Sequence, residues 1–257
     1  MLAVATLWRR EVLRFVRQRS RLVGSLAQPV VFWLLLGGGL SGAFRPPGTP
    51  AGSGYLEYFY PGVLALVLLF TAIFATISTV EDRRSGFLQG VLVAPVSRTA
   101  IVLGQSLGGT TLAVFEGALF LLLAPLAGVA LSVTRALAAA GIMALVAFGL
   151  TNLGLLIAWR MESTQGFHHI MNLILIPIWL LSGAFFPRLG LPAPLAWVMQ
   201  VDPLTYGLAA LRHCLYLGST PPVAGLPAFG ASVAVTAAFG VATLIAAVLA
   251  ARHSATL

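Results

Sequence analysis

The sequence predicts an all-α membrane protein that crosses a lipid bilayer several times. Of its 257 residues, 59% are hydrophobic and only 9% are charged, whereas soluble domains contain roughly 25% charged residues. Uncharged stretches of about 18 residues or more recur along the chain, and each is long enough to span a bilayer as a helix. The alternating ten-residue segments typical of a membrane barrel do not occur. We therefore expect a single transmembrane domain over residues 1–257.

All fifteen basic residues are arginine, and the sequence contains no lysine. A P-loop needs a lysine that reaches the β and γ phosphates of the nucleotide, and amine nucleophiles and Schiff bases also need one. We therefore expect this chain to bind no cofactor of its own. Six of the arginines lie within residues 9–21, next to the first apolar stretch. The net charge of +8 thus indicates attraction to a membrane surface rather than to nucleic acid.

Residues 1–22 are predicted to form an amphipathic helix that lies on the headgroups of the membrane. One stripe of this helix is basic and consists of Arg10, Arg14, Arg17 and Arg21. The opposite face is apolar and consists of Ala5, Trp8, Val12 and Phe15. A signal peptide is the competing interpretation, but its apolar core would be about 7 to 15 residues long. Because residues 22–44 are uncharged throughout, we expect a retained first span.

Six spans are predicted, at about residues 23–43, 60–80, 100–125, 136–159, 170–186 and 229–251. Arg160, Glu162, His168 and His169 are expected to form a polar turn before the fifth span. Pro177 should kink that span or mark local unwinding within it. The segment 188–225 is interrupted by prolines and is too broken to span, so we expect it to dip back into the outer leaflet.

The distribution of arginines predicts the orientation. With the N-terminus inside, the cytoplasmic segments hold eleven arginines and the outer segments hold four, which are Arg45, Arg135, Arg188 and Arg212. The positive-inside rule therefore favours six spans with both termini in the cytoplasm. A bacterial cytoplasmic membrane is the expected location.

Residues 81–98 form a polar island between two predicted spans. A helix is expected from Asp82 to Val93, because nothing interrupts the pattern before Ala94-Pro95 and a residue that precedes proline is biased away from helix. Its apolar stripe at helical spacing consists of Phe87, Leu88, Val91 and Leu92. Such an element lies at the membrane surface and can receive a soluble partner.

Two motifs resemble a known family. The pattern E-x-x-R-x-G-x-L, followed by APVSR, covers Glu81 to Leu88 and residues 94–98. LSGAFFP at residues 181–187 is followed by DPLTY…LR at residues 202–212. With the amphipathic start and the six spans, these motifs closely resemble ABC type-2 exporter permeases, of the drug-resistance branch, over nearly the whole chain. The sequence departs from the commoner pattern at Phe87, Gln89 and Asp202, where a small hydroxyl residue, an acid and an asparagine are frequent.

The resemblance implies that residues 81–98 hold the coupling helix, which docks on a separate ATPase. The implied coupling residues are Glu81, Asp82, Arg83, Arg84, Gly86, Phe87, Leu88 and Pro95. The ATPase, in two copies, would bind ATP and Mg, while this chain would form a homodimer, or a heterodimer with a related permease, because one six-span chain offers half a pathway. The outer-segment motif comprises Asp202, Pro203, Tyr206 and Arg212.

The substrate is expected to be drug-like or lipid-like and amphipathic, and export of a polysaccharide or an ion is the alternative. In this family spans two and five line the pathway, so the pathway candidates are Thr71, Thr76, Asn172 and Pro177. Two further polar residues lie within predicted spans. Glu116 and Asn152 either act in transport or tie helices together by hydrogen bonds.

Two other functions compete with transport as interpretations of the sequence. Gly104 to Gly108 fits G-x-S-x-G, which would make Ser106 the nucleophile of an intramembrane hydrolase. That motif needs a preceding strand, and here it lies in a predicted helix, where G-x-x-x-G favours close helix packing. Glu162, His168 and His169 could suggest a metal site, but adjacent histidines on a helix point about 100° apart. We expect neither catalysis nor metal binding.

Overall fold

The computed structural model describes residues 2–17, 19–44, 46–47, 54–93, 96–219 and 224–253, and every regular element within them is helical. The predicted all-α fold is therefore confirmed for this part of the chain. The elements, in order, are α1 (Leu2–Arg17), α2 (Arg19–Phe32), η1 (Trp33–Gly37), α3 (Gly38–Leu40), α4 (Tyr55–Ala75), α5 (Ile77–Arg84), α6 (Phe87–Val93), α7 (Arg98–Leu121), η2 (Ala124–Ala127), α8 (Val133–Ala158), α9 (Thr164–Trp179), η3 (Leu180–Ala184), α10 (Ala193–Val201), α11 (Pro203–Leu215) and α12 (Phe229–His253).

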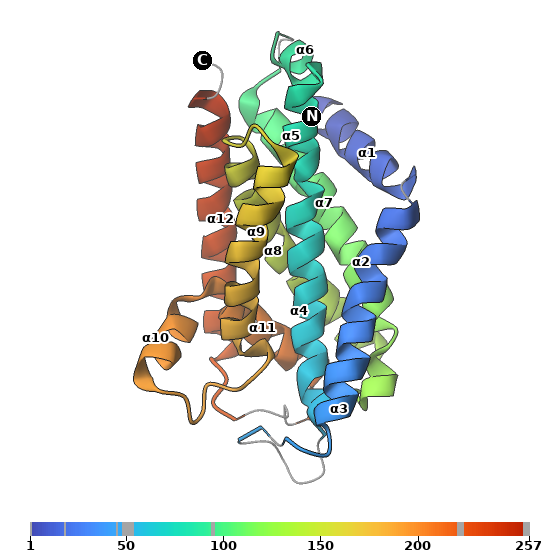
Figure 1. Ribbon diagram of the computed structural model, residues 1–257, viewed down its shortest axis with the longest axis vertical. Helices are drawn as coiled ribbons and strands as arrows, with labels where there is room; N and C mark the ends of the chain where they lie inside the picture. Colours follow the sequence, from blue (N-terminus) through green and yellow to red (C-terminus); the bar gives the residue numbers. More distant parts are fainter. Residues whose placement is uncertain are drawn as a thin grey trace.

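The long helices run side by side and form an elongated bundle (Figure 1). Helix α6, the start of α1 and the end of α12 all lie at one end of it, which we call the polar end. Helices α3 and α10 lie toward the opposite end, which we call the outer end. Both ends of the described chain therefore lie at the same end of the bundle.

Within the part of the chain that the structure describes, four helices are long and apolar enough to cross a membrane: Tyr55–Arg84, Val133–Ala158, Thr164–Ala184 and Phe229–His253. They coincide with predicted spans two, four, five and six. Gly24–Leu40 is a shorter apolar helix where the first span is expected. Helix α7, at the place of the third span, has 24 residues and thus a length of about 36 Å at 1.5 Å per residue, but it is not among the four. The count of six spans stays a prediction.

Helix α4 occupies the middle of the bundle, where α2, α7, α8 and α9 all contact it. Its aromatic residues Tyr55, Tyr58, Phe59 and Tyr60 are completely or almost completely buried. A Cβ atom added to Gly62 would lie 2.7 Å from the carbonyl oxygen of Ala184. Only glycine therefore allows η3 to approach α4 this closely, which is how small residues bring membrane helices together.

The single helix predicted from Asp82 to Val93 is wrong. Helix α5 ends at Arg84, and α6 begins at Phe87. Gly86 between them has a φ of +75°, a left-handed conformation that side chains other than glycine disfavour. The helical pattern on either side is uninterrupted, so the pattern alone did not reveal the break.

Two other predicted boundaries differ from the structure. The amphipathic element predicted over residues 1–22 ends at Arg17, and α2 then runs along the bundle from Arg19 (Figure 1). The polar turn predicted to include His168 and His169 is shorter, since α9 already begins at Thr164. Ser163 caps this helix, accepting a hydrogen bond of 3.0 Å from the backbone N–H of Gly166.

The proline-broken segment 188–225 contains two short helices in its described part. Asp202 caps α11, accepting a hydrogen bond of 2.9 Å from the backbone N–H of Leu204, and Pro203 occupies the first turn, where no backbone donor is needed. Helix α11 packs against α8 and α12. Near Pro177, α9 remains α-helical as far as Trp179 and then widens into the π-helical turn η3.

Candidate functional site

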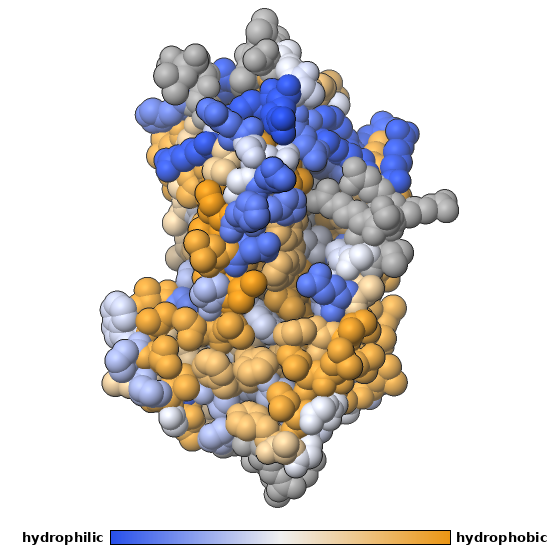
Figure 2. All heavy atoms as spheres, viewed as in Figure 1, coloured by the Kyte–Doolittle hydropathy of each residue, from blue (hydrophilic) through white to orange (hydrophobic). Residues whose placement is uncertain are grey.

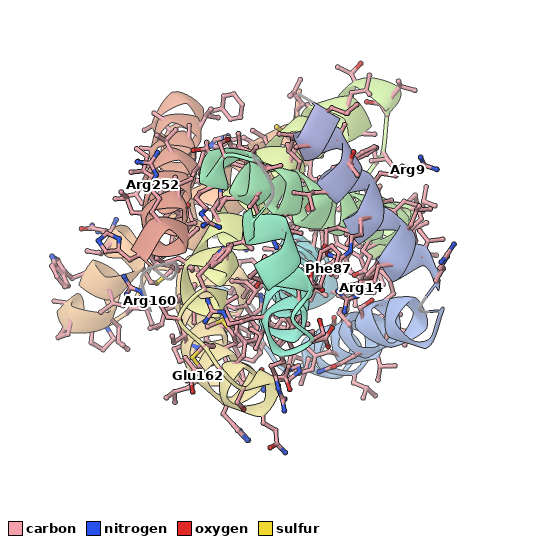
Figure 3. The ribbon with its side chains drawn as sticks, turned by 90° about the horizontal axis from the view of Figure 1, so that it is seen from above. Arg9, Arg14, Phe87, Arg160, Glu162 and Arg252 are labelled. Atoms are coloured by element: carbon pink, nitrogen blue, oxygen red, sulfur yellow. The ribbon has the colours of Figure 1, made fainter. Side chains whose placement is uncertain are left out.

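The polar end gathers the charged side chains of several helices. Seen from above, Arg9, Arg14, Phe87, Arg160, Glu162 and Arg252 all lie on this end, with Arg14 and Phe87 near its middle (Figure 3). In the side view, hydrophilic residues cluster over the same end, and much of the rest of the visible face is apolar (Figure 2). A water-soluble partner would therefore meet the molecule at this end.

Asp82 joins the N-terminal helix to the end of α5. The two terminal guanidinium nitrogens of Arg10 donate to the carboxylate of Asp82, at 2.5 and 2.6 Å. Arg14 donates to the same carboxylate at 3.1 Å. Only 4% of the Asp82 side chain is exposed. Bidentate charge-assisted bonds of this kind are strong and geometrically specific. Asp82 thus holds α1 against α5 and is not available to a partner.

The neighbours of Asp82 differ in their exposure. Glu81 pairs with Arg14, and 45% of its side chain is exposed. Arg83 points inward and donates to the backbone carbonyl of Trp159 at the end of α8. Arg84 is exposed. Among the predicted coupling charges, Glu81 and Arg84 therefore face outward, whereas Asp82 and Arg83 stabilise the chain itself.

Phe87 and Leu88 are neighbours at the start of α6 but differ sharply in exposure. Phe87 is 42% exposed, and the guanidinium of Arg10 sits 3.9 Å from the centre of its ring. Leu88 is 3% exposed and packs with Ile101, Val102 and Trp159. Leu88 consequently anchors α6 to α7 and α8, and Phe87 remains available at the surface. Pro95 lies outside the described residues.

The G-x-S-x-G pattern is a helix-packing surface in the structure. A Cβ atom on Gly104 would lie 2.7 Å from the Cβ atom of Leu7, and one on Gly108 would lie 2.7 Å from the Cβ atom of Glu11. These glycines let α1 lie directly on α7. The Ser106 hydroxyl is completely buried in the same helix and has no hydrogen-bond partner among the described atoms. A buried helical serine lacks the exposed turn that a nucleophile elbow requires.

A lateral groove of about 690 Å³ runs between α2, α4 and α9. Its polar lining consists of Ser25, Gln28, Thr71, Glu81, His168 and Asn172, and its aromatic and aliphatic lining includes Phe32, Leu66, Phe70, Phe74, Ile176 and Trp179. Glu81 and His168 belong to the part of the groove near the polar end, and Phe32 and Trp179 lie farther along their helices. Phe15 and Ile77 also line the groove near the polar end, so polar and apolar side chains share its wall.

Glu116 lies behind this groove and is completely buried. Ser25 of α2 donates to one of its carboxylate oxygens at 2.5 Å, and Thr71 of α4 donates to the other. Glu116 therefore ties α7 to both helices that form the back of the groove. Of the two functions that the sequence left open for this residue, the structure shows the helix-tying contacts.

Two of the four residues predicted to line the transport pathway lie in the groove, and two do not. Asn172 lines the groove together with Thr71, whereas Thr76 and Pro177 are not among its lining residues. Thr76 donates to the carbonyl oxygen of Ile73 at 2.7 Å and lies against Gly154 of α8. Asn152 is completely buried between α8 and α12, with its amide nitrogen 3.5 Å from the carbonyl oxygen of Gly240.

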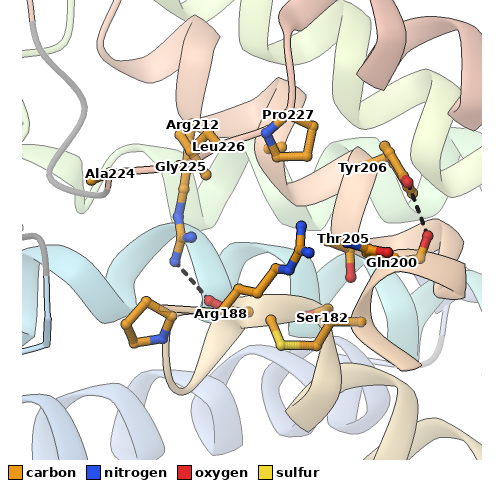
Figure 4. A pocket seen from close by; sticks show the side chains of 14 residues that line it. Ser182, Arg188, Gln200, Thr205, Tyr206, Arg212, Ala224, Gly225, Leu226 and Pro227 are labelled. Carbon is orange, nitrogen blue, oxygen red and sulfur yellow. Dashed lines mark hydrogen bonds between the residues drawn. The ribbon is translucent and has the colours of Figure 1, made fainter. Parts of the chain in front are cut away.

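The outer-segment motif forms a second polar cluster, around Arg212, Tyr58 and Tyr206, which we call the outer cluster (Figure 4). Arg212, which is 2% exposed, donates to the carbonyl oxygen of Gly183 at 3.0 Å and lies 4.7 Å above the ring of Tyr58. The Tyr58 hydroxyl donates to the same carbonyl oxygen at 2.9 Å. Tyr206 donates to the carbonyl oxygen of Gln200 at 2.9 Å. These bonds join α11, η3 and α4 at the outer end.

Sequence reasoning missed the contribution of α1 to the polar end. The basic stripe predicts that Arg10 and Arg14 contact lipid headgroups, but their guanidinium groups pair with Glu81 and Asp82. The available signal was that Glu81 and Asp82 are two of only seven acidic residues in the chain. Neither has an arginine four positions away in its own helix. Ser25 and Gln28 of the groove carried no distinguishing signal.

Comparison with known proteins agrees with this architecture. A family described as ABC-2 type transporter matches residues 3–216. The putative transport permease ycf38 of Cyanophora paradoxa is 25% identical over 208 residues, covering 79% of this chain and 71% of the relative. Nodulation protein J of Rhizobium meliloti (strain 1021) is 27% identical over 217 residues, covering 82% of this chain and 80% of the relative. Because the family match extends over residues 3–216, from α1 through α11, this chain belongs to the ABC-2 type transporter family and is a transport permease.

Proposed function

We propose that the chain is the membrane subunit of an ATP-driven exporter with six spans in a bacterial cytoplasmic membrane and both termini in the cytoplasm. Two permease chains, identical or related, enclose the pathway. Two copies of a separate ATPase bind ATP and Mg. The lack of lysine, and hence of a P-loop, supports assigning the nucleotide to that partner.

The surface around Phe87 is the observation that carries this proposal. Phe87 is exposed at the polar end on a short helix that the adjacent Leu88 anchors to the bundle, and the guanidinium of Arg10 lies against its ring. Exposed aromatic anchors are typical of the centres of protein interfaces. Arg84, at the end of α5, is exposed and can pair with an acidic residue of the ATPase.

The groove between α2, α4 and α9 supports an amphipathic substrate. Its aromatic walls suit the apolar part of a drug-like or lipid-like molecule, and Thr71, Asn172 and His168 offer hydrogen bonds near the polar end. Entry from the inner leaflet would place the polar part of the substrate near Glu81. ATP-driven movement of α5 would then change the width of the groove, because Thr71 and Glu81 belong to the same long helix, Tyr55–Arg84.

Co-expression with the cognate ATPase tests this function. The purified chain should neither bind nor hydrolyse ATP, and the complex in lipid nanodiscs should hydrolyse ATP at a rate that an amphipathic substrate increases. Asn172→Leu should reduce that increase, while the exposed Leu137→Ala on α8 should not. Nucleotide binding at micromolar affinity by the isolated chain would contradict the assignment.

A further inference from the structure

The outer cluster encloses a small cavity that the transport function does not use. Its volume is about 60 Å³, several times the 10 to 15 Å³ that one water needs. Two arginines from different segments line it, Arg188 after η3 and Arg212 of α11, and Figure 4 shows both side chains extending into the same pocket. Hydroxyl groups of Ser182, Thr205 and Tyr206 are also in the lining.

The charges in this cavity are unbalanced. Arg212 is almost completely buried, and its Nε has no hydrogen-bond partner among the described atoms. No carboxylate of the described residues lies within 4.0 Å of a nitrogen atom of Arg188 or Arg212. The partners of Arg212 are backbone carbonyl oxygens and the ring of Tyr58. Arg188 is exposed, and its guanidinium faces the side-chain amide of Gln200, whose oxygen accepts from it in the orientation that satisfies both groups. Buried charges are normally paired, and Arg212 has no ion-pair partner among the described residues, so an anion would complete the pair.

We propose that this cavity binds an oxyanion of phosphate size, held between the Arg188 and Arg212 guanidinium groups. Planar guanidinium groups bind phosphate and carboxylate oxygens in bidentate fashion. The hydroxyls of Ser182, Thr205 and Tyr206 already donate to Trp179, Asp202 and Gln200, so the two arginines supply the donors. The oxyanion would join the segment after η3 to α11 and stabilise the outer end. It belongs either to a free phosphate ion or to the headgroup of an anionic lipid.

The test uses the full chain in nanodiscs, with thermal unfolding followed by tryptophan fluorescence. In one arm, inorganic phosphate is titrated into phosphatidylcholine nanodiscs at constant ionic strength. In the other, phosphatidylglycerol replaces part of the phosphatidylcholine without free phosphate. We expect a saturable rise of the Tm in one arm. Arg188→Gln should raise the half-saturating concentration at least tenfold, whereas the matched control Arg160→Gln, at the polar end, should respond as the wild type.

Arg188 is the appropriate position because its side chain is exposed, so the substitution should leave the fold intact, whereas Arg212 also holds η3 in place. A difference between Arg188→Gln and Arg160→Gln in the phosphate arm identifies a soluble oxyanion, and a difference in the lipid arm identifies a headgroup. No stabilisation of the wild type in either arm, or equal responses of the two variants in both, would overturn the proposal.

Discussion

Asp82 and Glu81 are adjacent acids with different roles. The Asp82 carboxylate is buried under Arg10 and Arg14, and that of Glu81 is nearly half exposed. Breaking a buried ion pair from one side leaves an uncompensated charge, which costs about 3 kcal/mol or more, whereas exposed pairs contribute about 1 kcal/mol or less. Because the side chains of Arg10 and Arg14 are 30% and 29% exposed, we expect Asp82→Asn to destabilise the chain by about 1.5 to 3 kcal/mol, the range for hydrogen bonds to charged groups, and to expose α1 to protease.

Glu81→Gln is the control for this prediction, since it removes a negative charge from the neighbouring position. It should change the stability by less than about 1 kcal/mol. The measurement is unfolding in mixed micelles together with limited proteolysis of α1. Equal effects of the two substitutions would mean that Asp82 does not hold α1 in place.

Phe87 and Leu88 allow docking to be separated from folding. Phe87→Ala removes an exposed ring, so expression, insertion and dimerisation should stay near normal while binding of the ATPase weakens by a few kcal/mol. Leu88→Ala opens a cavity in the α6 to α7 contact and should lower stability by about 2 to 5 kcal/mol. Co-elution with the ATPase and the Tm of the isolated permease measure the two effects. If Phe87→Ala co-elutes like the wild type, α6 is not the docking helix.

At the scale of the element, Gly86 sets the direction of α6. Its left-handed backbone separates α6 from α5, and alanine there would cost about 1 to 2 kcal/mol in that conformation. Gly86→Ala should therefore favour a continuous helix and move Phe87 away from Arg10. We expect ATPase stimulation in the complex to fall several-fold, with a smaller change in stability.

Gly90 in α6 provides the matched control. A Cβ atom added there meets nothing within 4 Å, and alanine is the better helix former by up to about 1 kcal/mol. Gly90→Ala should thus keep full stimulation and stability. The measurement is ATPase stimulation by both variants in nanodiscs. Similar losses of stimulation would show that any substitution in α6 reduces it, and would contradict a specific role for the backbone conformation of Gly86.

At the scale of the whole molecule, the asymmetry of arginines predicts the orientation of the bundle. A cysteine placed at Ser85, between α5 and α6, should react with a membrane-impermeant reagent only from the cytoplasmic side. One placed at Ser53, which lies outside the described residues, should react only from the opposite side. The native Cys214 is buried and should contribute little background. Labelling of both positions from the same side would rule out six spans with cytoplasmic ends.

Much of this protein follows from its sequence alone. The lengths of the apolar stretches determine the helical class and the places of α4, α8, α9 and α12, because a helix in lipid satisfies its own backbone and needs no information from elsewhere in the chain. The motifs around Glu81 and Asp202 indicated the family, and the spacing of Gly104 and Gly108 indicated a packing surface. All of these are local properties.

The tertiary structure decided which polar residues serve the fold and which face outward. Arg10 and Asp82 are 72 positions apart, and Tyr58 and Arg212 are 154 apart, so no periodicity relates them. The break at Gly86 depends on a single backbone conformation that a helical pattern does not record. The groove and the outer cavity exist only where helices distant in sequence meet, because burial and charge pairing are set by neighbours in space.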